Sequence, residues 1–187
     1  MSSQATMPDL ETEKARDTSD QSKSSETYLV FELDGSEYAI TVQYVREIIT
    51  SMEPSPVPGA PNYIRGVINL RGRILPLVDM RKRFAMKPAK SGARECWIIM
   101  VLDSEDGVIE VGISVDSVCE VVHIATEAID SAPIFNDDED RLVFKGVAKT
   151  QSGVKLILDS SALVDQLRRD VQVRSNAQPA TPAVATS

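Results

Sequence analysis

Four strand–turn–strand patterns fill most of the chain between residues 28 and 158, and they restrict its possible folds more than any other feature. In the first pattern, two apolar segments flank Asp34-Gly35, a pair that accepts the positive φ angles of a type I′ turn. The predicted hairpins pair 28–33 with 36–41, 66–70 with 73–78, 97–102 with 108–115, and 142–150 with 154–158. Short strands at this spacing predict a mainly β fold of the sandwich or barrel type, not a doubly wound sheet.

The helices are expected to be few and short. Apolar residues in 42–49 recur at helical spacing, which predicts a short helix there. Asp79 is suited to cap a helical turn over 80–84, in which the basic run 81–83 is expected to form the exposed face. A C-terminal helix is predicted over 160–169. Four prolines within 51–62 predict a stiff, extended loop between the first two hairpins.

The chain also contains an internal repeat. Segment 39–49 matches segment 112–122 at four of eleven positions, and each copy follows an Asp-Gly turn. A second correspondence relates 64–67 to 144–147, and the same spacing relates Asp79 to Asp159. Two copies of one hairpin unit predict two small, similar β-barrels that share an apolar interface. The alternative is that any two β-hairpins resemble each other to this degree.

Charge and hydropathy exclude several classes of protein. A net charge of -8 argues against general nucleic-acid binding, which needs a positive surface. The charge is uneven, however, with +4 over 27–94 and -9 over 95–169, which is typical of complementary faces. No apolar run is long enough for a transmembrane helix, and the N-terminus does not read as a secretory signal. The polar segments 1–26 and 170–187 are expected to be disordered, which leaves 27–169 as the folded part.

The sequence lacks the spacing of known catalytic and metal sites. It contains no glycine-rich phosphate loop, and one histidine with two distant cysteines cannot form a zinc site. Cys96 and Cys119 are expected to be reduced core residues, and His123 a partly buried structural side chain. The run 137–140 is expected to be a solvated acidic loop rather than a calcium site. We therefore predict no catalytic residue, metal or cofactor, although carboxylates paired in space remain an alternative.

The densest polar cluster lies in 62–81. A structural hairpin needs Gly72 for its turn, but it does not need the other polar residues of this cluster. These are Arg65, Asn69, Arg71 and Arg73. Asn69 is suited to bond the turn backbone, and Arg71 either is a solvated turn charge or pairs with Glu47 beside an apolar seam.

Four further segments are YLVFELDGSEYAI, PNYIRGVINLRGRILPLVDMRKRF, VGISVDSVCEV, and KGVAKT followed by GVKLILD. Through these segments the sequence resembles the CheW family of bacterial chemotaxis coupling proteins, and the resemblance covers about 27–169. It implies two SH3-like five-stranded β-barrels packed around a shared hydrophobic core. We expect the first barrel in about 34–85 and the second in about 27–33 plus 94–159. It further implies a non-catalytic adaptor that couples the cytoplasmic tips of methyl-accepting chemoreceptors to the histidine kinase CheA.

The resemblance also assigns residues to two binding surfaces. The implied kinase-binding residues are Val45, Glu47, Arg71, Gly72 and Gly146, and they would meet the regulatory domain of the kinase, which has the same fold. The implied receptor-binding residues, in the groove between the barrels, are Val101, Leu102 and Val115. The implied residues of the turn and of its structural motif are Arg65, Gly66, Asn69, Pro76 and Asp79.

The same resemblance implies a cytoplasmic protein that reaches membrane receptor arrays through its partners and does not insert into the membrane. The uneven charge suggests head-to-tail contacts with itself or with other CheW-like domains, and such contacts can close into rings. Two alternatives remain at this point. One is a scaffold of the same fold in another receptor–kinase pathway, such as surface motility or biofilm formation, and the other is a small carboxylate-dependent enzyme.

Overall fold

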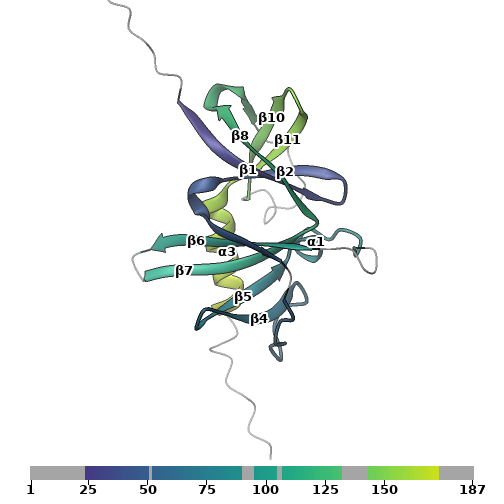
Figure 1. Cartoon of the computed structure of the whole chain (residues 1–187), viewed down its shortest axis with the longest axis vertical. Helices are drawn as coiled ribbons and strands as arrows, with labels where there is room; N and C mark the ends of the chain where they lie inside the picture. The colour runs from purple at the N-terminus through teal and green to yellow at the C-terminus, as the bar shows by residue number, and fades with distance from the viewer. Residues whose placement is uncertain (1–23, 51, 90–94, 105–106, 132–142, 173–187) are drawn as a thin grey trace, which may run out of the picture.

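The computed structural model describes residues 24–50, 52–89, 95–104, 107–131 and 143–172, and these form a mainly β structure (Figure 1). The strands are β1 (Ser25–Leu33), β2 (Ser36–Thr41), β3 (Val45–Thr50), β4 (Ile64–Leu70), β5 (Arg73–Asp79), β6 (Cys96–Ser104), β7 (Gly107–Val115), β8 (Ser117–Ala125), β9 (Ile129–Ser131), β10 (Phe144–Thr150) and β11 (Gly153–Leu158). The helical elements are η1 (Val42–Tyr44), α1 (Met80–Arg83), η2 (Thr126–Ala128) and α3 (Ser160–Gln172). The predicted fold class is therefore confirmed.

The strands form two sheets. Sheet one has the strand order β8-β1-β2-β11-β10-β9, and sheet two has the order β3-β6-β7-β5-β4. Neighbouring strands are antiparallel except for β11 beside β2 and β5 beside β7, which are parallel. In Figure 1 sheet one lies at the top and sheet two at the bottom, and α3 runs from just below sheet one across sheet two. Each sheet has five main strands, and sheet one adds the three-residue strand β9.

The internal repeat predicted from the sequence is present in the structure. The hairpins β4–β5 and β10–β11 occupy equivalent positions in the two sheets, and each is followed by a helix. The amide of Asp79 donates to the Tyr63 carbonyl at 2.7 Å, and the amide of Asp159 donates to the Val143 carbonyl at 2.8 Å. Each of these aspartates then caps the helix that follows, by accepting from the amide three residues later at 3.0 Å.

The predicted division of the chain between the two barrels is wrong in two places. Strands β1 and β2 lie together in sheet one, and the hairpin β6–β7 belongs to sheet two. The reason is a reciprocal exchange of strands. After each of these hairpins the next strand crosses to the other sheet, so that β3 pairs with β6 and β8 pairs with β1. Sequence proximity alone therefore assigned residues 34–41 and 94–115 to the wrong barrel.

The helix predicted over 42–49 is also wrong. Only Val42–Tyr44 forms a 3₁₀ turn, and the next six residues are strand β3. Half-buried and exposed residues alternate along this strand, with Val45, Glu47 and Ile49 half-buried. The β-branched residues of this segment favour the extended conformation. Its short apolar pattern is compatible with the period of a helix and with the period of a strand, so the pattern alone did not decide between them.

Buried apolar side chains form three clusters. The largest, the shared core, lies between the sheets and includes Phe31, Ile113 and Leu163 from sheet one, sheet two and α3. A second cluster, around Tyr28, fills the interior of sheet one, and a third, around Trp97, fills the interior of sheet two. The inward positions of both sheets are therefore buried, whereas outward positions such as Ile74 on β5 and Val121 on β8 are exposed.

The ordered part extends slightly beyond the predicted limits. Strand β1 begins at Ser25, inside the segment expected to be disordered, and α3 continues to Gln172. Segments 1–23 and 173–187 and the acidic run 137–140 lie outside the described residues. Within the described residues, no helix is both long and apolar enough to cross a membrane.

Candidate functional site

The predicted pair of Glu47 and Arg71 is present on sheet two. Arg71 and Gly72 have φ angles of 53° and 84°, as a type I′ turn between β4 and β5 requires. Asn69 stabilises this turn, because its Oδ1 accepts from the Gly72 amide at 2.9 Å. The turn carries the guanidinium of Arg71 to β3, where Nη2 lies 3.0 Å from Oε2 of Glu47.

The two side chains of this pair differ in exposure. Arg71 is 73% exposed, whereas Glu47 is 19% exposed. An ion pair with one largely solvated partner contributes only about 0–1 kcal/mol to stability. Glu47 therefore orients an arginine whose outer surface is open to solvent, which suits contact with another molecule more than support of the fold.

Two further arginines, Arg46 on β3 and Arg73 on β5, lie close in sequence to this pair. The carboxylate of Glu110 on β7 binds Arg73 at 2.5 Å and also binds Arg46. Next to Arg73 on β5, the apolar side chain of Ile74 is 73% exposed. A shallow hollow of about 540 Å³ is lined by Arg46, Arg73, Ile74, Val108 and Glu110. We call Glu47, Arg71 and these five residues the Arg71 surface.

Two of the residues implied to bind a kinase are less accessible. Val45 is half-buried, packs against the shared core and pairs with Met100 of β6. Gly146 is buried in β10, where a Cβ atom would lie 2.3 Å from the Asp130 carbonyl oxygen of β9. Gly146 is thus required for close strand packing, and any partner would meet the backbone around it rather than a side chain.

The three residues implied to bind receptors are not brought together. Val101 and Leu102 are half-buried near one end of β6, whereas Val115 pairs with Cys96 at its other end. Val115 is 1% exposed and belongs to the shared core, so the expectation that it lies on a surface is wrong. Its apolar character in a strand pattern does not by itself distinguish a buried position from a groove.

A cleft of about 230 Å³ lies near Leu102. Its lining comes from β5, β7 and α3, and consists of Pro76, Val108, Ile109, Glu110, Val111, Leu167 and Arg168. Leu102 pairs directly with Ile109 of this lining. The cleft is therefore an apolar depression beside Val101 and Leu102, two of the predicted receptor-binding residues.

The remaining motif residues have structural roles. Arg65 forms an ion pair with Glu95, and Asp79 caps α1. Gly66 has a φ of 145° and lies against the backbone of Ser55.

His123 is exposed, not partly buried as expected, and forms a hydrogen bond with Thr27 through Nδ1 at 3.0 Å. Cys119 is likewise exposed, and both cysteines are free.

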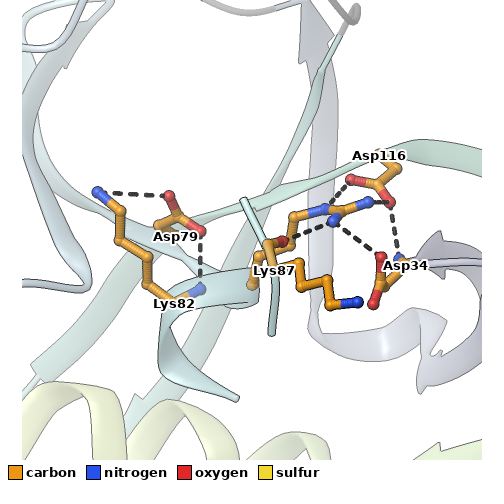
Figure 2. Close-up of polar contacts among 6 residues, drawn as sticks. Asp34, Asp79, Lys82, Lys87 and Asp116 are labelled. Carbon is orange, nitrogen blue, oxygen red and sulfur yellow. Dashed lines mark hydrogen bonds and ion pairs between the residues drawn. The ribbon is translucent and has the colours of Figure 1, made fainter. Parts of the chain in front are cut away.

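The sequence analysis missed the polar cluster around Arg81, which Figure 2 shows. The Nε and Nη2 atoms of Arg81 donate to the two carboxylate oxygens of Asp116 at 2.7 and 2.5 Å. Its Nη1 donates to Asp34 at 3.1 Å and to the Lys87 carbonyl at 2.8 Å. The expectation that 81–83 form an exposed helix face is therefore wrong for Arg81, whose side chain is 17% exposed. No local pattern marks the cluster, because its acids come from turns distant in the sequence.

This cluster makes the protein sensitive to acid. Burial raises the pKa of Asp116, but hydrogen bonds from Arg81 and from the Asp34 amide outweigh it, so the pKa lies below 3.8. A carboxylate with a lowered pKa stabilises the fold above its unfolded pKa, and this contribution is lost as the pH falls through the folded value. Asp116→Asn is therefore expected to lower the free energy of unfolding at pH 7 and to have less effect near pH 3. Urea titrations of both proteins across this range measure the difference, and an equal deficit at both pH values would contradict the assignment.

Lys155 is a second residue that the sequence did not mark. Its side chain is 0% exposed, and its ammonium pairs with Glu37 and lies 3.5 Å from Glu120. Lys155 occupies the position in hairpin β10–β11 of sheet one that Leu75 holds in hairpin β4–β5 of sheet two. The described residues contain no group of three or more acidic, histidine or cysteine side chains suited to a metal ion.

Comparison with known proteins assigns the family. The model of the CheW-like domain matches residues 27–168, which include every candidate residue named above. The chain belongs to the CheW family. It is 35% identical over 144 residues to the chemotaxis protein CheW of Bacillus subtilis, covering 77% of this chain and 90% of that relative. It is 30% identical over 138 residues to the probable chemotaxis protein CheW of Rhizobium etli, covering 74% and 86%.

The fold agrees with this assignment. The structure is similar to the crystal structure of the scaffolding protein TtCheW from Thermoanaerobacter tengcongensis, with a TM-score of 0.61 and 29% identity. The match covers 73% of this chain and 90% of that chain. The chain is therefore a chemotaxis adaptor of the CheW family, and the two sheets are the two barrels that the resemblance implied.

Proposed function

We propose that this CheW-family chain joins the regulatory domain of a CheA-type histidine kinase to the cytoplasmic tips of methyl-accepting chemoreceptors. The observation that carries the kinase contact is the Arg71 surface, where Arg71 is held outward by Glu47 beside the exposed Ile74. Arginine is one of the residue types enriched among interface hot spots. Glu47 and Arg71 supply orientation, and the apolar neighbours supply most of the affinity.

The receptor tip is assigned to the cleft between β7 and α3. The apolar lining of this cleft adjoins Leu102, and Arg168 at its rim provides a polar contact. Val101, which pairs with Glu110, lies next to the same rim. A groove with an apolar floor and charged edges suits an amphipathic helix.

A second protein surface is assigned to sheet one, near Gly146. The exposed Val121 and Val154 of sheet one correspond, through the internal repeat, to the exposed Ile48 and Ile74 of sheet two. Because each sheet carries one of these surfaces, the chain can contact one kinase domain through each sheet. Contacts with itself or with another CheW-like domain would use the same two surfaces and close into rings.

This function involves no catalysis by the chain itself, and it locates the protein in the cytoplasm at membrane receptor arrays, through its partners. The decisive experiment mixes the full chain with a receptor cytoplasmic fragment and a CheA-type kinase, and measures kinase autophosphorylation. Stimulation that requires all three components supports the proposal. Stimulation that is unchanged when the chain is omitted would refute it.

Arg71→Ala is expected to weaken kinase binding roughly tenfold to thirtyfold, as the loss of a hot-spot side chain does. The free energy of unfolding should change by less than about 1 kcal/mol, because the ion pair is largely exposed. Calorimetric titration with the kinase regulatory domain measures the first quantity, and urea denaturation measures the second. Arg169→Ala, which removes an exposed arginine of α3, is the control and should bind normally. Unaltered binding by a folded Arg71→Ala protein would remove Arg71 from the proposed interface.

A further inference from the structure

The chain crosses between the two sheets at two places among its described strands. The first crossing is η1, between β2 and β3, and the second is the single residue Asp116, between β7 and β8. All other strands are connected within one sheet. The relative orientation of the sheets therefore depends on how these two crossings are held, together with the shared core.

The two crossings are held by different chemistry. At the first, Val42 and Tyr44 pack against the shared core, and the Thr41 amide donates to Oγ of Ser160 at 3.0 Å. At the second, Asp116 accepts two hydrogen bonds from Arg81. The residue that corresponds to Arg81 in the other half of the repeat is Ser161, two residues after Asp159, so the ionic contact has no counterpart there.

Arg81 lies on α1, which follows the last residue of β5, so its backbone moves with sheet two. Its guanidinium reaches Asp34, in the β1–β2 turn of sheet one, and Asp116 at the crossing. Asp116 in turn accepts from the Asp34 amide at 2.8 Å, and its own amide donates to the Glu32 carbonyl at 3.0 Å. Figure 2 shows that these groups converge from three separate segments of the chain.

We propose that Arg81 is a positioning residue that fixes the orientation of sheet one relative to sheet two. The planar guanidinium binds two carboxylates from different directions, which a flexible single-point donor cannot do. Its consequence for the adaptor rests on the proposed function, in which each sheet holds a partner. The angle between the sheets then sets the angle between the partners, and a ring of head-to-tail contacts closes only for a fixed rotation.

The first test measures the orientation directly and needs no partner. Residual dipolar couplings of backbone amides give an alignment tensor for each sheet, and the two tensors report the angle between sheets. Arg81→Met is expected to rotate the tensors relative to each other or to reduce the order of one sheet. Lys82→Met, on the next residue of α1 and exposed, is the control and should leave the angle unchanged. A folded Arg81→Met protein with the wild-type angle and order would overturn the proposal.

Two milder variants separate positioning from general loss of stability. Arg81→Lys keeps the charge but loses the two-pronged contact, so it should also alter the angle. Asp34→Asn weakens only the bond to sheet one, at a carboxylate that is 47% exposed, and should fold even if Arg81→Met does not. If both variants lose stability but keep the wild-type angle, Arg81 is structural only and the proposal fails.

The second test measures the consequence for coupling. Binary binding of Arg81→Lys to the kinase domain is expected to remain within about twofold of wild type, because Arg81 is outside the Arg71 surface. Kinase stimulation in the three-component assay should fall at least about fivefold, a typical coupling effect. If Arg81→Lys changes the angle between the sheets but stimulates the kinase normally, the proposed effect of this angle on coupling is overturned. If the wild-type chain neither binds nor stimulates the kinase, the proposed function fails while the angle measurement still tests Arg81.

Discussion

Gly66→Ala is expected to lower the free energy of unfolding by about 3 kcal/mol or more, because two independent penalties act at one position. The φ angle of Gly66 is 145°, a conformation that residues with a Cβ atom rarely adopt. A Cβ atom built there would lie 2.2 Å from the Ser55 carbonyl oxygen and 2.7 Å from its carbon. Both contacts are with backbone, so no side-chain rotation relieves them.

The clash would also break a specific contact. The amide and carbonyl of Ser55 bond Val67, each at 2.8 Å, and this bridge attaches the proline-rich loop to β4. Urea denaturation of Gly66→Ala measures the total loss. Gly59→Ala is the matched control, since Gly59 has a φ of 76° and no atom within 4 Å of its added Cβ. Gly59→Ala should lower the free energy of unfolding by only about 1 kcal/mol. Equal losses in the two variants would show that the close approach of Gly66 to Ser55 does not contribute to stability.

The hairpins and the repeat were predictable from the sequence for a physical reason. The pairs Asp34-Gly35 and Arg71-Gly72 adopt positive φ angles at both residues, and such two-residue turns are typical connections between antiparallel strands. Local chemistry therefore fixes which strands form hairpins. The repeated Gly in β4 and β10 was also informative, because in both sheets a neighbouring backbone lies where a Cβ atom would be.

The exchange of β3 and β8 between the sheets was not predictable in this way. Nothing in the sequence of a single strand records which partner it pairs with, because pairing depends on the packing of the whole core. The same limit applies to Val115 and Gly146, whose burial results from elements distant in sequence. The contact between Glu47 and Arg71 was one of two predictions for Arg71, the other being a solvated charge at the turn.

Buried charges were the hardest feature to anticipate. Arg81 lies in a basic run that suggested solvent exposure, and Lys155 is a charged residue in an otherwise apolar strand. Their main carboxylate partners, Asp116 and Glu37, come from distant parts of the sequence. Long-range ion pairs leave no local pattern. The repeat could have indicated that Lys155 is buried. Its counterpart in the other half of the repeat is Leu75, an apolar residue in an apolar strand.

Lys155 replaces an apolar core position with a paired ammonium. In sheet two, Leu75 pairs across the hairpin with Ile68, and in sheet one Lys155 pairs with Ala148. The longer lysine stem thus faces a smaller partner, which keeps the interior of sheet one filled. The ammonium at the end of the stem reaches Glu37 and Glu120, whose side chains are 33% and 40% exposed.

Lys155→Ala is expected to lower the free energy of unfolding by about 2–4 kcal/mol, because it leaves a cavity and removes the cation from its carboxylate partners. Lys155→Leu should cost less than about 1 kcal/mol, since leucine restores the apolar stem and the two glutamates can turn toward water. Urea denaturation at pH 7 measures both. If the leucine variant loses as much stability as the alanine variant, the ion pair rather than the packing of the stem dominates at this position.

The pH dependence separates the two contributions further. Burial lowers the pKa of Lys155, but the hydrogen bond and attraction of Glu37 outweigh it, so the pKa is raised above 10.5. A lysine with a raised pKa stabilises the fold fully below its unfolded pKa, and this contribution is lost as the pH rises through the folded value. The deficit of Lys155→Leu relative to wild type should therefore shrink or change sign above pH 10.5. The deficit of Lys155→Ala should keep the part that comes from the cavity, because an empty volume does not titrate.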